Sequence, residues 1–192
     1  MIKFNSGSNR IFYLLLFLIC LYLLISRADY IAQRAYPFAY REIIITEAHK
    51  NRLEPLLVAA VIFVESSFNE KAQSAKGARG LMQIMPETGM WVAGQLGMDN
   101  FTAELLFEPQ TNIAIGTWYI RDLLQQFNGN IYLALAAYNG GRSNVSMWLQ
   151  KGIWDGRRET LKSIPFPETR YFVLKVERTY QRYKWIYKEI GN

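Results

Sequence analysis

The sequence holds one cysteine, Cys20, and one histidine, His49, among 192 residues. One cysteine excludes a disulfide framework and a cysteine-based metal site within a single chain. Tracts rich in Gly and Ser or in Gln and Asn are missing, and no segment repeats at a fixed period, which excludes long low-complexity regions and solenoid architectures. We therefore expect one compact domain that holds neither a metal nor another cofactor.

The excess of charge is basic, with 22 Lys and Arg residues against 16 Asp and Glu residues and a net charge of +6. This balance suits any polyanion, including nucleic acid, anionic lipid and an acidic cell-wall polymer. The basic residues are scattered, and their densest group has the pattern of a solvated helix face, so we expect no nucleic-acid partner. That group is Lys175, Arg178, Arg182, Lys184 and Lys188.

The longest apolar run covers residues 11–25 and contains no charge. As a helix it is about 22 Å long, and the flanking residues up to 27 extend it toward the ~30 Å of a bilayer core. Lys3 and Arg10 precede the run, which places the N-terminus in the cytoplasm. We predict a cytoplasmic segment 1–10, a single transmembrane anchor 11–27 in the cell membrane, a linker 28–36 and an extracytoplasmic catalytic domain 37–192.

A cleaved signal peptide and a lipoprotein anchor are the alternatives to a retained helix. A signal peptide needs a small-x-small cleavage site, and Ser26-Arg27-Ala28 is a poor one, so the retained anchor is favoured. A lipidated cysteine needs a small residue before it, whereas Ile19 precedes Cys20. Membrane contact is therefore expected through the N-terminal helix.

Residues 37–192 have the pattern of a mainly α-helical domain with six or seven helices. Residues 56–64 (LLVAAVIFV) are apolar on every side, so they predict a helix buried in the middle of the domain and too short to span a bilayer. Two glycines and two basic residues in 75–80 predict a loop or one small β-hairpin. Helices are expected to begin near Pro37, Pro55, Pro86, Pro109 and Pro167, and another covers residues 131–138.

Glu65 directly follows the apolar helix and is the first candidate for catalysis. Burial and the negative end of the helix dipole both favour its neutral form, so we expect a raised pKa. A carboxyl group that stays protonated near neutral pH can donate its proton to a leaving oxygen, as a glycosidase general acid does. Taken alone, the position also fits a glutamate that merely reaches solvent where the helix ends.

Three sequence segments, one of which begins at Glu65, favour the catalytic interpretation of this residue. They read ESSFN at 65–69, GARGLMQIMPET at 77–88 and AAYNGG at 136–141. In order and spacing they resemble the three sequence blocks of the soluble-lytic-transglycosylase catalytic domain family. The resemblance covers about residues 37–188 and departs from the family at Phe172, where a tyrosine is usual, so this chain has no hydroxyl at that position.

The resemblance implies a lysozyme-like α fold and cleavage of the β-1,4 bond between N-acetylmuramic acid and N-acetylglucosamine in peptidoglycan. In the family one glutamate, here Glu65, protonates the glycosidic oxygen and then takes the proton of the muramic acid 6-hydroxyl, which closes on C1 to give a 1,6-anhydro end. Ordinary glycosidases need two carboxylates, but Glu70 and Glu87, the other acids of the blocks, look like surface or capping residues. A cell-wall or secretion machine is a further candidate partner.

The three blocks and the last helix supply the expected substrate contacts. Gly80 is expected to let the backbone approach a sugar, Met82 to form an apolar wall and Gln83 to bind an N-acetyl group. Tyr138 is expected to hydrogen-bond the Glu65 carboxyl, and Ser66 to bind substrate or steady the loop. The predicted substrate-binding residues are Ser66, Gly80, Leu81, Met82, Gln83, Tyr138, Asn139 and Glu168, the last resembling a family carboxylate near the site.

Two other functions remain open at this point. A goose-type lysozyme of the same fold would use water on the same bond, and the mass of its product would differ. A glycan-binding scaffold without catalysis would have no use for a buried acid, which argues against it. The five tryptophans have helical spacing and are expected in the core; they are Trp91, Trp118, Trp148, Trp154 and Trp185.

Overall fold

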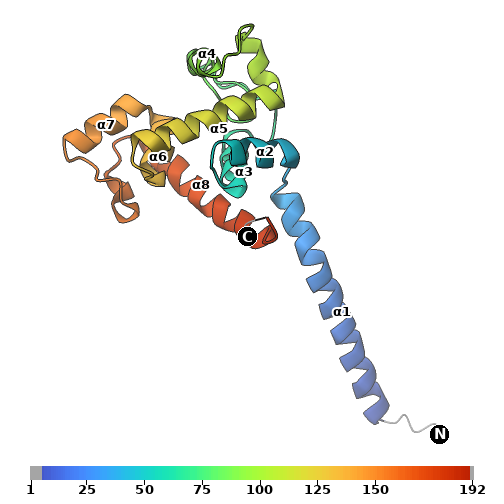
Figure 1. Ribbon diagram of the computed structural model, residues 1–192. Helices are drawn as coiled ribbons and strands as arrows, with labels where there is room; N and C mark the ends of the chain where they lie inside the picture. The colour runs from blue at the N-terminus through green and yellow to red at the C-terminus, as the bar shows by residue number, and fades with distance from the viewer. Residues whose placement is uncertain (1–5, 191–192) are drawn as a thin grey trace. The chain divides into compact units, whose positions relative to one another are not determined.

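The computed structural model describes residues 6–190, and the chain divides into two compact units with the boundary between Pro37 and Phe38. The first unit contains one helix, α1 (Ser6–Ala35), drawn in blue in Figure 1. The large apolar side chains from Ile11 to Leu24 in this helix are exposed, each by at least 41%.

The prediction of a transmembrane helix at residues 11–27 is not confirmed. Within residues 6–190, the structure has no helix that combines the length and the apolar character needed to cross a membrane. The uncharged run measures about 22 Å as a helix, less than the ~30 Å of a bilayer core. Residues 28–35, predicted as part of a linker, continue α1.

The second unit is built from helices, which confirms the mainly α prediction. In the described part of this unit, short-range backbone pairing replaces the expected hairpin: two isolated bridges join Gln73 to Arg79 and Arg79 to Ile84. The helices are α2 (Arg41–Lys50), α3 (Pro55–Ser66), α4 (Pro86–Gln95), α5 (Pro109–Gln126), α6 (Ile131–Gly140), α7 (Arg142–Gln150) and α8 (Pro167–Ile186), with the 3-10 helices η1 (Ala103–Phe107) and η2 (Arg158–Ser163).

Proline begins four of these helices, as predicted. It occupies the first turn of α3, α4, α5 and α8, where its missing N–H leaves no hydrogen bond unmade. The expected helix start at Pro37 is wrong, because α2 begins at Arg41. Tyr40, the residue before α2, has a φ of 55°, so the chain turns there in the left-handed region before the helix starts.

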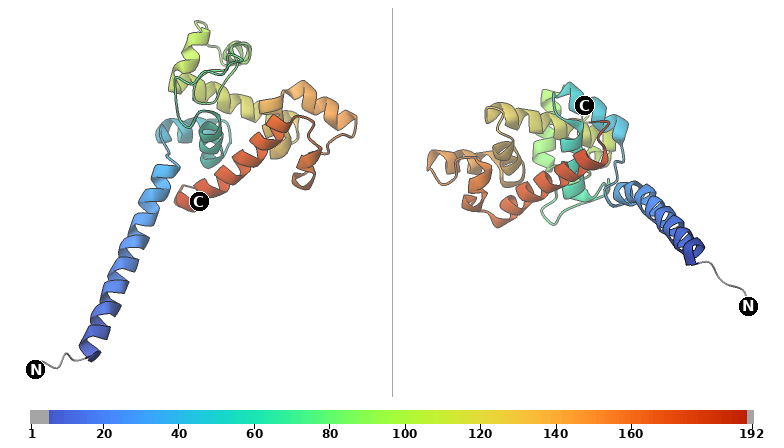
Figure 2. Two further views of the ribbon diagram at one scale, coloured as in Figure 1. Left: turned by 180° about the vertical axis from the view of Figure 1, so that it is seen from behind. Right: turned by 90° about the horizontal axis from the view of Figure 1, so that it is seen from below.

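Helix α3 lies in the middle of the second unit, as its apolar sequence predicts. Leu56 and all residues from Val58 to Ile62 are fully buried. The helix packs against α2 on one side and α8 on the other, and α6 packs against α5, α7 and α8. Helix α8 is the long red helix in both views of Figure 2. The central position of α3 holds its C-terminal end, and with it Glu65, in a fixed place.

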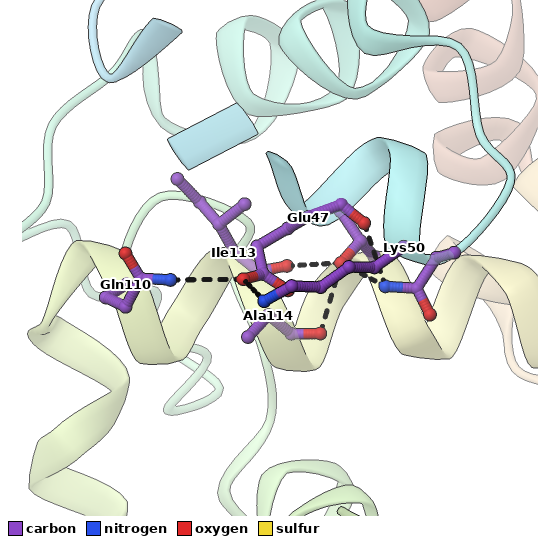
Figure 3. Close-up of polar contacts among 7 residues, drawn as sticks. Glu47, Lys50, Gln110, Ile113 and Ala114 are labelled. Carbon is purple, nitrogen blue, oxygen red and sulfur yellow. Dashed lines mark hydrogen bonds and ion pairs between the residues drawn. The ribbon is translucent and has the colours of Figure 1, made fainter. Parts of the chain in front are cut away.

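A polar cluster fastens α2 to α5 (Figure 3). Glu47 is 5% exposed, and its side chain accepts hydrogen bonds from Lys50 Nζ at 2.6 Å and from Gln110 Nε2 at 3.1 Å. Asn51 Nδ2 donates to Thr117 Oγ1 at 3.0 Å. These bonds satisfy polar groups that burial would otherwise leave without a partner.

Candidate active site

Glu65 lies in the last turn of α3 and is half-buried. The pKa of its carboxyl group is raised to about 8, mainly by burial and then by the nearby Glu168 carboxylate, while Lys175 acts in the opposite direction. The direction confirms the expectation from sequence. Both charged neighbours belong to α8, so the packing of α8 on α3 brings them to Glu65. A carboxyl group of this kind remains mostly protonated at neutral pH.

The loop between α3 and α4 passes directly beside Glu65 and needs glycine at one position. Gly80 has a φ of 72°, and a Cβ there would lie 2.0 Å from the carbonyl oxygen of Leu106 and 2.4 Å from Asn112 Nδ2. The backbone of Gly80 thus approaches the protein's own η1–α5 junction, which requires a glycine by itself. The predicted close approach of a sugar to Gly80 stays a prediction.

Asn112 holds this loop and was not among the predicted site residues. Its side chain is completely buried, accepts from Met82 N at 2.7 Å, and donates to the carbonyl oxygens of Arg79 at 2.9 Å and Leu106 at 2.6 Å. An amide can make all three bonds at once because it carries both an acceptor and two donors. The only signal in the sequence is a polar residue on the buried face of α5.

Two helices bind successive carbonyl groups of the same loop. Ser66 Oγ, at the end of α3, donates to Leu81 O at 2.8 Å. Tyr138 Oη, in α6, donates to Met82 O at 2.6 Å. A phenol has one proton, and Tyr138 uses it on Met82 O, so among the described residues the hydrogen bond expected between Tyr138 and the Glu65 carboxyl is not formed. Of the two roles expected for Ser66, the structure contains the one that steadies the loop.

Three of the predicted substrate-contact residues make their contacts within the protein itself. Leu81 and Met82 are fully buried, and a Cβ on Gly116 would lie 2.3 Å from the Met82 sulfur. Met82 is therefore a core residue and presents no apolar wall to a ligand. Gln83 Nε2 donates to Ala72 O at 3.1 Å and to Gly80 O at 2.9 Å, which uses both amide protons.

The two remaining predicted residues connect the site to α8. Asn139 Oδ1 accepts from the buried Thr169 Oγ1 at 2.8 Å. The Glu168 side chain is 74% exposed and pairs with Lys76 Nζ at 3.4 Å across solvent. Asn139 thus helps to dock α6 on α8, whereas Glu168 is a surface carboxylate close enough to Glu65 to affect its pKa.

Tyr138, Phe172 and Tyr119 form an aromatic wall, and Tyr138 lies close to Glu65. The Tyr138 ring stacks on Phe172, with centroids 6.2 Å apart and planes 8° from parallel, and contacts Tyr119 at 5.6 Å. The pKa of the Tyr138 hydroxyl is raised well above its usual value by burial first, then by Glu65 and Tyr119. Phe172 therefore serves as a stacking partner for Tyr138 at the position where the resemblance leads one to expect a tyrosine.

The wall continues into a cavity of about 660 Å³ lined by residues of α4, α5 and the α6–α7 junction. Trp91, 40% exposed, and Tyr119 form its aromatic surface. The Arg142 guanidinium lies 4.8 Å from the Trp91 ring centroid and pairs with Asp122 at 2.7 Å. Glu87 also lines this cavity, although its sequence position suggested only a capping residue.

This arrangement can bind a chain of sugar rings and protonate one of them. The cavity has the volume of a small-ligand site, and exposed aromatic rings stack on sugars. The protonated Glu65 is the one carboxyl group of the described residues in this region that combines substantial burial with a strongly raised pKa. A single buried acid, connected to the cavity through Tyr138 and Tyr119, is suited to cleaving a glycosidic bond.

The family described as Transglycosylase SLT domain matches residues 42–160. The soluble lytic murein transglycosylase of Salmonella typhimurium is 37% identical over 152 residues, which are 77% of this chain and 23% of that protein. The membrane-bound lytic murein transglycosylase E of Buchnera aphidicola is 30% identical over 155 residues, 76% of this chain and 67% of that protein. The chain thus spans about a quarter of the length of the soluble relative.

Solved structures agree with these matches. An inactive glutamate-to-glutamine mutant of the lytic transglycosylase Slt from Pseudomonas aeruginosa superimposes with a TM-score of 0.74 and 33% identity, over 81% of this chain and 25% of that one. The 70 kDa soluble lytic transglycosylase in complex with bulgecin A superimposes with a TM-score of 0.76 and 32% identity, over 81% of this chain and 26% of that one.

Proposed function

The chain belongs to the Transglycosylase SLT domain family, and from this premise we propose that it is a lytic transglycosylase of peptidoglycan. It cleaves the β-1,4 bond between N-acetylmuramic acid and N-acetylglucosamine without water and leaves a 1,6-anhydromuramic acid end. The observation that carries the proposal is Glu65, a half-buried acid with a pKa of about 8, whose neighbour Tyr138 contacts Tyr119 in the lining of the aromatic cavity.

In the first step Glu65 acts as the general acid. Its proton moves to the glycosidic oxygen while the bond from that oxygen to C1 of muramic acid breaks, so N-acetylglucosamine leaves with a neutral hydroxyl group. Glu65 becomes a carboxylate, and the developing positive charge on the muramic acid ring lies beside it. The hydrophobic surroundings that keep the acid protonated make it a better proton donor at neutral pH than an exposed glutamate.

In the second step the same carboxylate is the base. It takes the proton of the muramic acid 6-hydroxyl as O6 bonds to C1, which restores the Glu65 acid and closes the anhydro ring. No water is consumed. An internal hydroxyl has a large advantage in effective concentration over water, because it is already tethered to the sugar that reacts. A second carboxylate is therefore unnecessary.

The loop beside Glu65 supports this chemistry by its rigidity. Asn112, Ser66 and Tyr138 each bind a backbone group of residues 79–82, so the loop faces the acid in one conformation. We assign Ser66, Leu81, Met82 and Gln83 to positioning, since their bonds and burial lie within the protein. Pre-ordered surroundings lower the cost of reaching the reactive geometry.

Replacement of the acid tests this proposal. Glu65→Gln keeps the shape of the side chain but removes its proton, so release of glycan fragments from purified sacculi should fall by at least ~10²-fold. Glu159→Gln is the matched control, because it makes the same change at an exposed carboxylate on η2 that has no assigned role in the site. A Glu65→Gln protein that still releases fragments at the wild-type rate would refute the assignment.

We also propose that α1 attaches the protein to the cell membrane, with the second unit on the extracytoplasmic side. The exposed apolar side chains of Ile11–Leu24 support this proposal, as does the basic residue before them. The Buchnera relative is described as membrane-bound. Attachment would keep the enzyme close to its substrate, the peptidoglycan layer.

A further inference from the structure

A second groove runs along α5 on a different face from the catalytic cavity. It consists of two cavities of about 570 and 480 Å³ that share Lys50, Asn51 and Arg121 as lining residues. Helix α5 is 18 residues long, about 27 Å at the usual helical rise, so the groove can accept an extended ligand. We call these two cavities the basic groove.

Helical spacing separates the basic groove from the active site. Ala114, Trp118 and Arg121, at intervals of four and three residues, line the groove. Tyr119, one residue after Trp118, lines the catalytic cavity instead. Residues three or four apart share a helix face, whereas adjacent residues do not. A ligand in the groove therefore contacts a different face of α5 from the one that lines the cleft holding Arg142, about 100° around the helix.

The charge of the groove is positive and only partly compensated. Its cations are Lys50, Arg52 and Arg121, and its one lining carboxylate, Glu47, is 5% exposed. The Glu47 carboxylate already accepts hydrogen bonds from Lys50 and Gln110, as Figure 3 shows. Among residues 6–190, the six ion pairs include neither Arg52 nor Arg121.

Arg121 is positioned for an anion by an aromatic contact. Its guanidinium carbon lies 5.3 Å from the Trp118 ring centroid. Its Nε atom is buried and has no hydrogen-bond partner in the described part of the chain. Because this Nε atom is itself buried, a carboxylate in the groove would reach the outer guanidinium nitrogens of Arg121, with which it can form two parallel hydrogen bonds. The groove thus contains an oriented, incompletely satisfied arginine.

We propose that the basic groove is a second binding site for peptidoglycan, where it holds the free carboxylates of the peptide stems while Glu65 cuts a glycan strand elsewhere. The inference rests on the proposed function for the identity of its ligand. Leu53, in the groove, lies two residues before the start of α3, and Glu65 lies near the other end of that helix, about 15 Å from its start. A recessed, elongated site suits a discrete carboxylate-bearing chain better than it suits a flat lipid surface.

Binding to sacculi tests the groove separately from catalysis. All proteins carry Glu65→Gln, so that the sacculi stay intact, and binding is measured by co-sedimentation. The groove variant adds Arg52→Gln and Arg121→Gln. The matched control adds Lys162→Gln and Arg182→Gln, which remove the same charge from exposed positions on η2 and α8. Arg52→Gln alone, at an exposed position, checks the result without disturbing the contact of Arg121 with Trp118.

The groove variant should bind at least ~5-fold more weakly than the control, and Arg52→Gln alone should show a smaller loss of the same kind. Amidation of the free carboxyl groups of the sacculi should weaken binding of the control to the level of the groove variant. Equal binding by groove and control proteins would overturn the inference, as would binding unaffected by amidation. A loss seen only with phosphatidylglycerol vesicles would assign the groove to membranes and also overturn it.

Activity separates failure of this inference from failure of the proposed function. With Glu65 present, the groove variant should cleave short soluble glycan fragments within twofold of the control but digest sacculi more slowly. If the wild type cleaves sacculi and the groove variant binds them normally, the groove inference alone is wrong. If the wild type releases no fragments, the proposed function is wrong.

Discussion

At the scale of single residues, Glu65 illustrates how a fold changes the chemistry of an ordinary side chain. A solvated glutamate is deprotonated at neutral pH, but burial at the end of α3, together with the charge of Glu168, raises the pKa of this one to about 8. Lys175 acts in the opposite sense and keeps the shift from growing. The proposed reaction needs both states of the group in turn, so a pKa close to the working pH serves both steps.

The raised pKa predicts the direction of pH dependence. Glu65 must begin each turnover protonated, and its protonated fraction falls about tenfold per pH unit above its pKa. Activity on soluble glycan fragments should therefore decline as pH rises through about 8 and continue to fall toward pH 10. Return of the same sample to pH 7 should restore the rate, which excludes unfolding as the cause. A rate that still climbs above pH 9 would identify a different acid.

At the scale of elements, the loop between α3 and α4 depends on glycine for two separable reasons. Gly80 has a left-handed φ of 72° and no room for a Cβ, whereas Gly77 has a φ of 90° with no atom within 4 Å of the added Cβ. Gly77→Ala should cost about 1 kcal/mol in unfolding free energy from backbone strain alone, and Gly80→Ala roughly 3 kcal/mol because of the added clash. Urea denaturation measures both values. Equal losses for the two variants would show that the Leu106 carbonyl group moves aside without a cost in free energy.

The helices could be predicted from sequence because each of their signals is local. Proline at the first turn predicted the start of α3, α4, α5 and α8, and the uniformly apolar residues 56–64 predicted the burial of α3. Pro37 was misleading, because a proline that precedes a left-handed Tyr40 belongs to a turn. The raised pKa of Glu65 could be predicted by the same local reasoning, since burial and position at the helix end act on the residue itself.

The site's internal bonds could not be predicted, because they join residues far apart in the sequence. Asn112 binds groups about thirty positions earlier, and Tyr138 binds a carbonyl 56 positions earlier. Asn112 was not among the predicted site residues, and Tyr138 was expected to bond the Glu65 carboxyl instead. The prediction that the tryptophans lie in the core was wrong in part for a related reason. Trp148 and Trp154 are core residues as expected, but Trp91 and Trp185 are 40% and 55% exposed. Helical spacing alone does not tell which face of a helix meets solvent.

At the scale of the whole molecule, the chain combines the apolar helix α1 with the second unit, for which we propose catalysis. If α1 attaches the protein to a membrane, full-length protein should stay in the membrane fraction through washes with high salt and with alkaline carbonate. A variant with Leu15, Leu18 and Leu23 changed to Asp should be released, because each change puts a charge on the exposed apolar surface of α1. A soluble mature protein that starts near Asp29 would instead establish a cleaved signal peptide.

The product of cleavage tests the central claim, that one glutamate and the substrate's own hydroxyl complete the reaction without water. Wild-type protein is incubated with purified sacculi, and the released muropeptides are analysed by mass spectrometry. The account predicts 1,6-anhydromuramic acid ends, lighter by one water, about 18 Da, than hydrolysis products, because the tethered 6-hydroxyl outcompetes water. Muropeptides with reducing muramic acid ends would contradict it. They would identify a lysozyme-type hydrolase and make Glu168, the carboxylate that raises the pKa of Glu65, the first candidate for activating water.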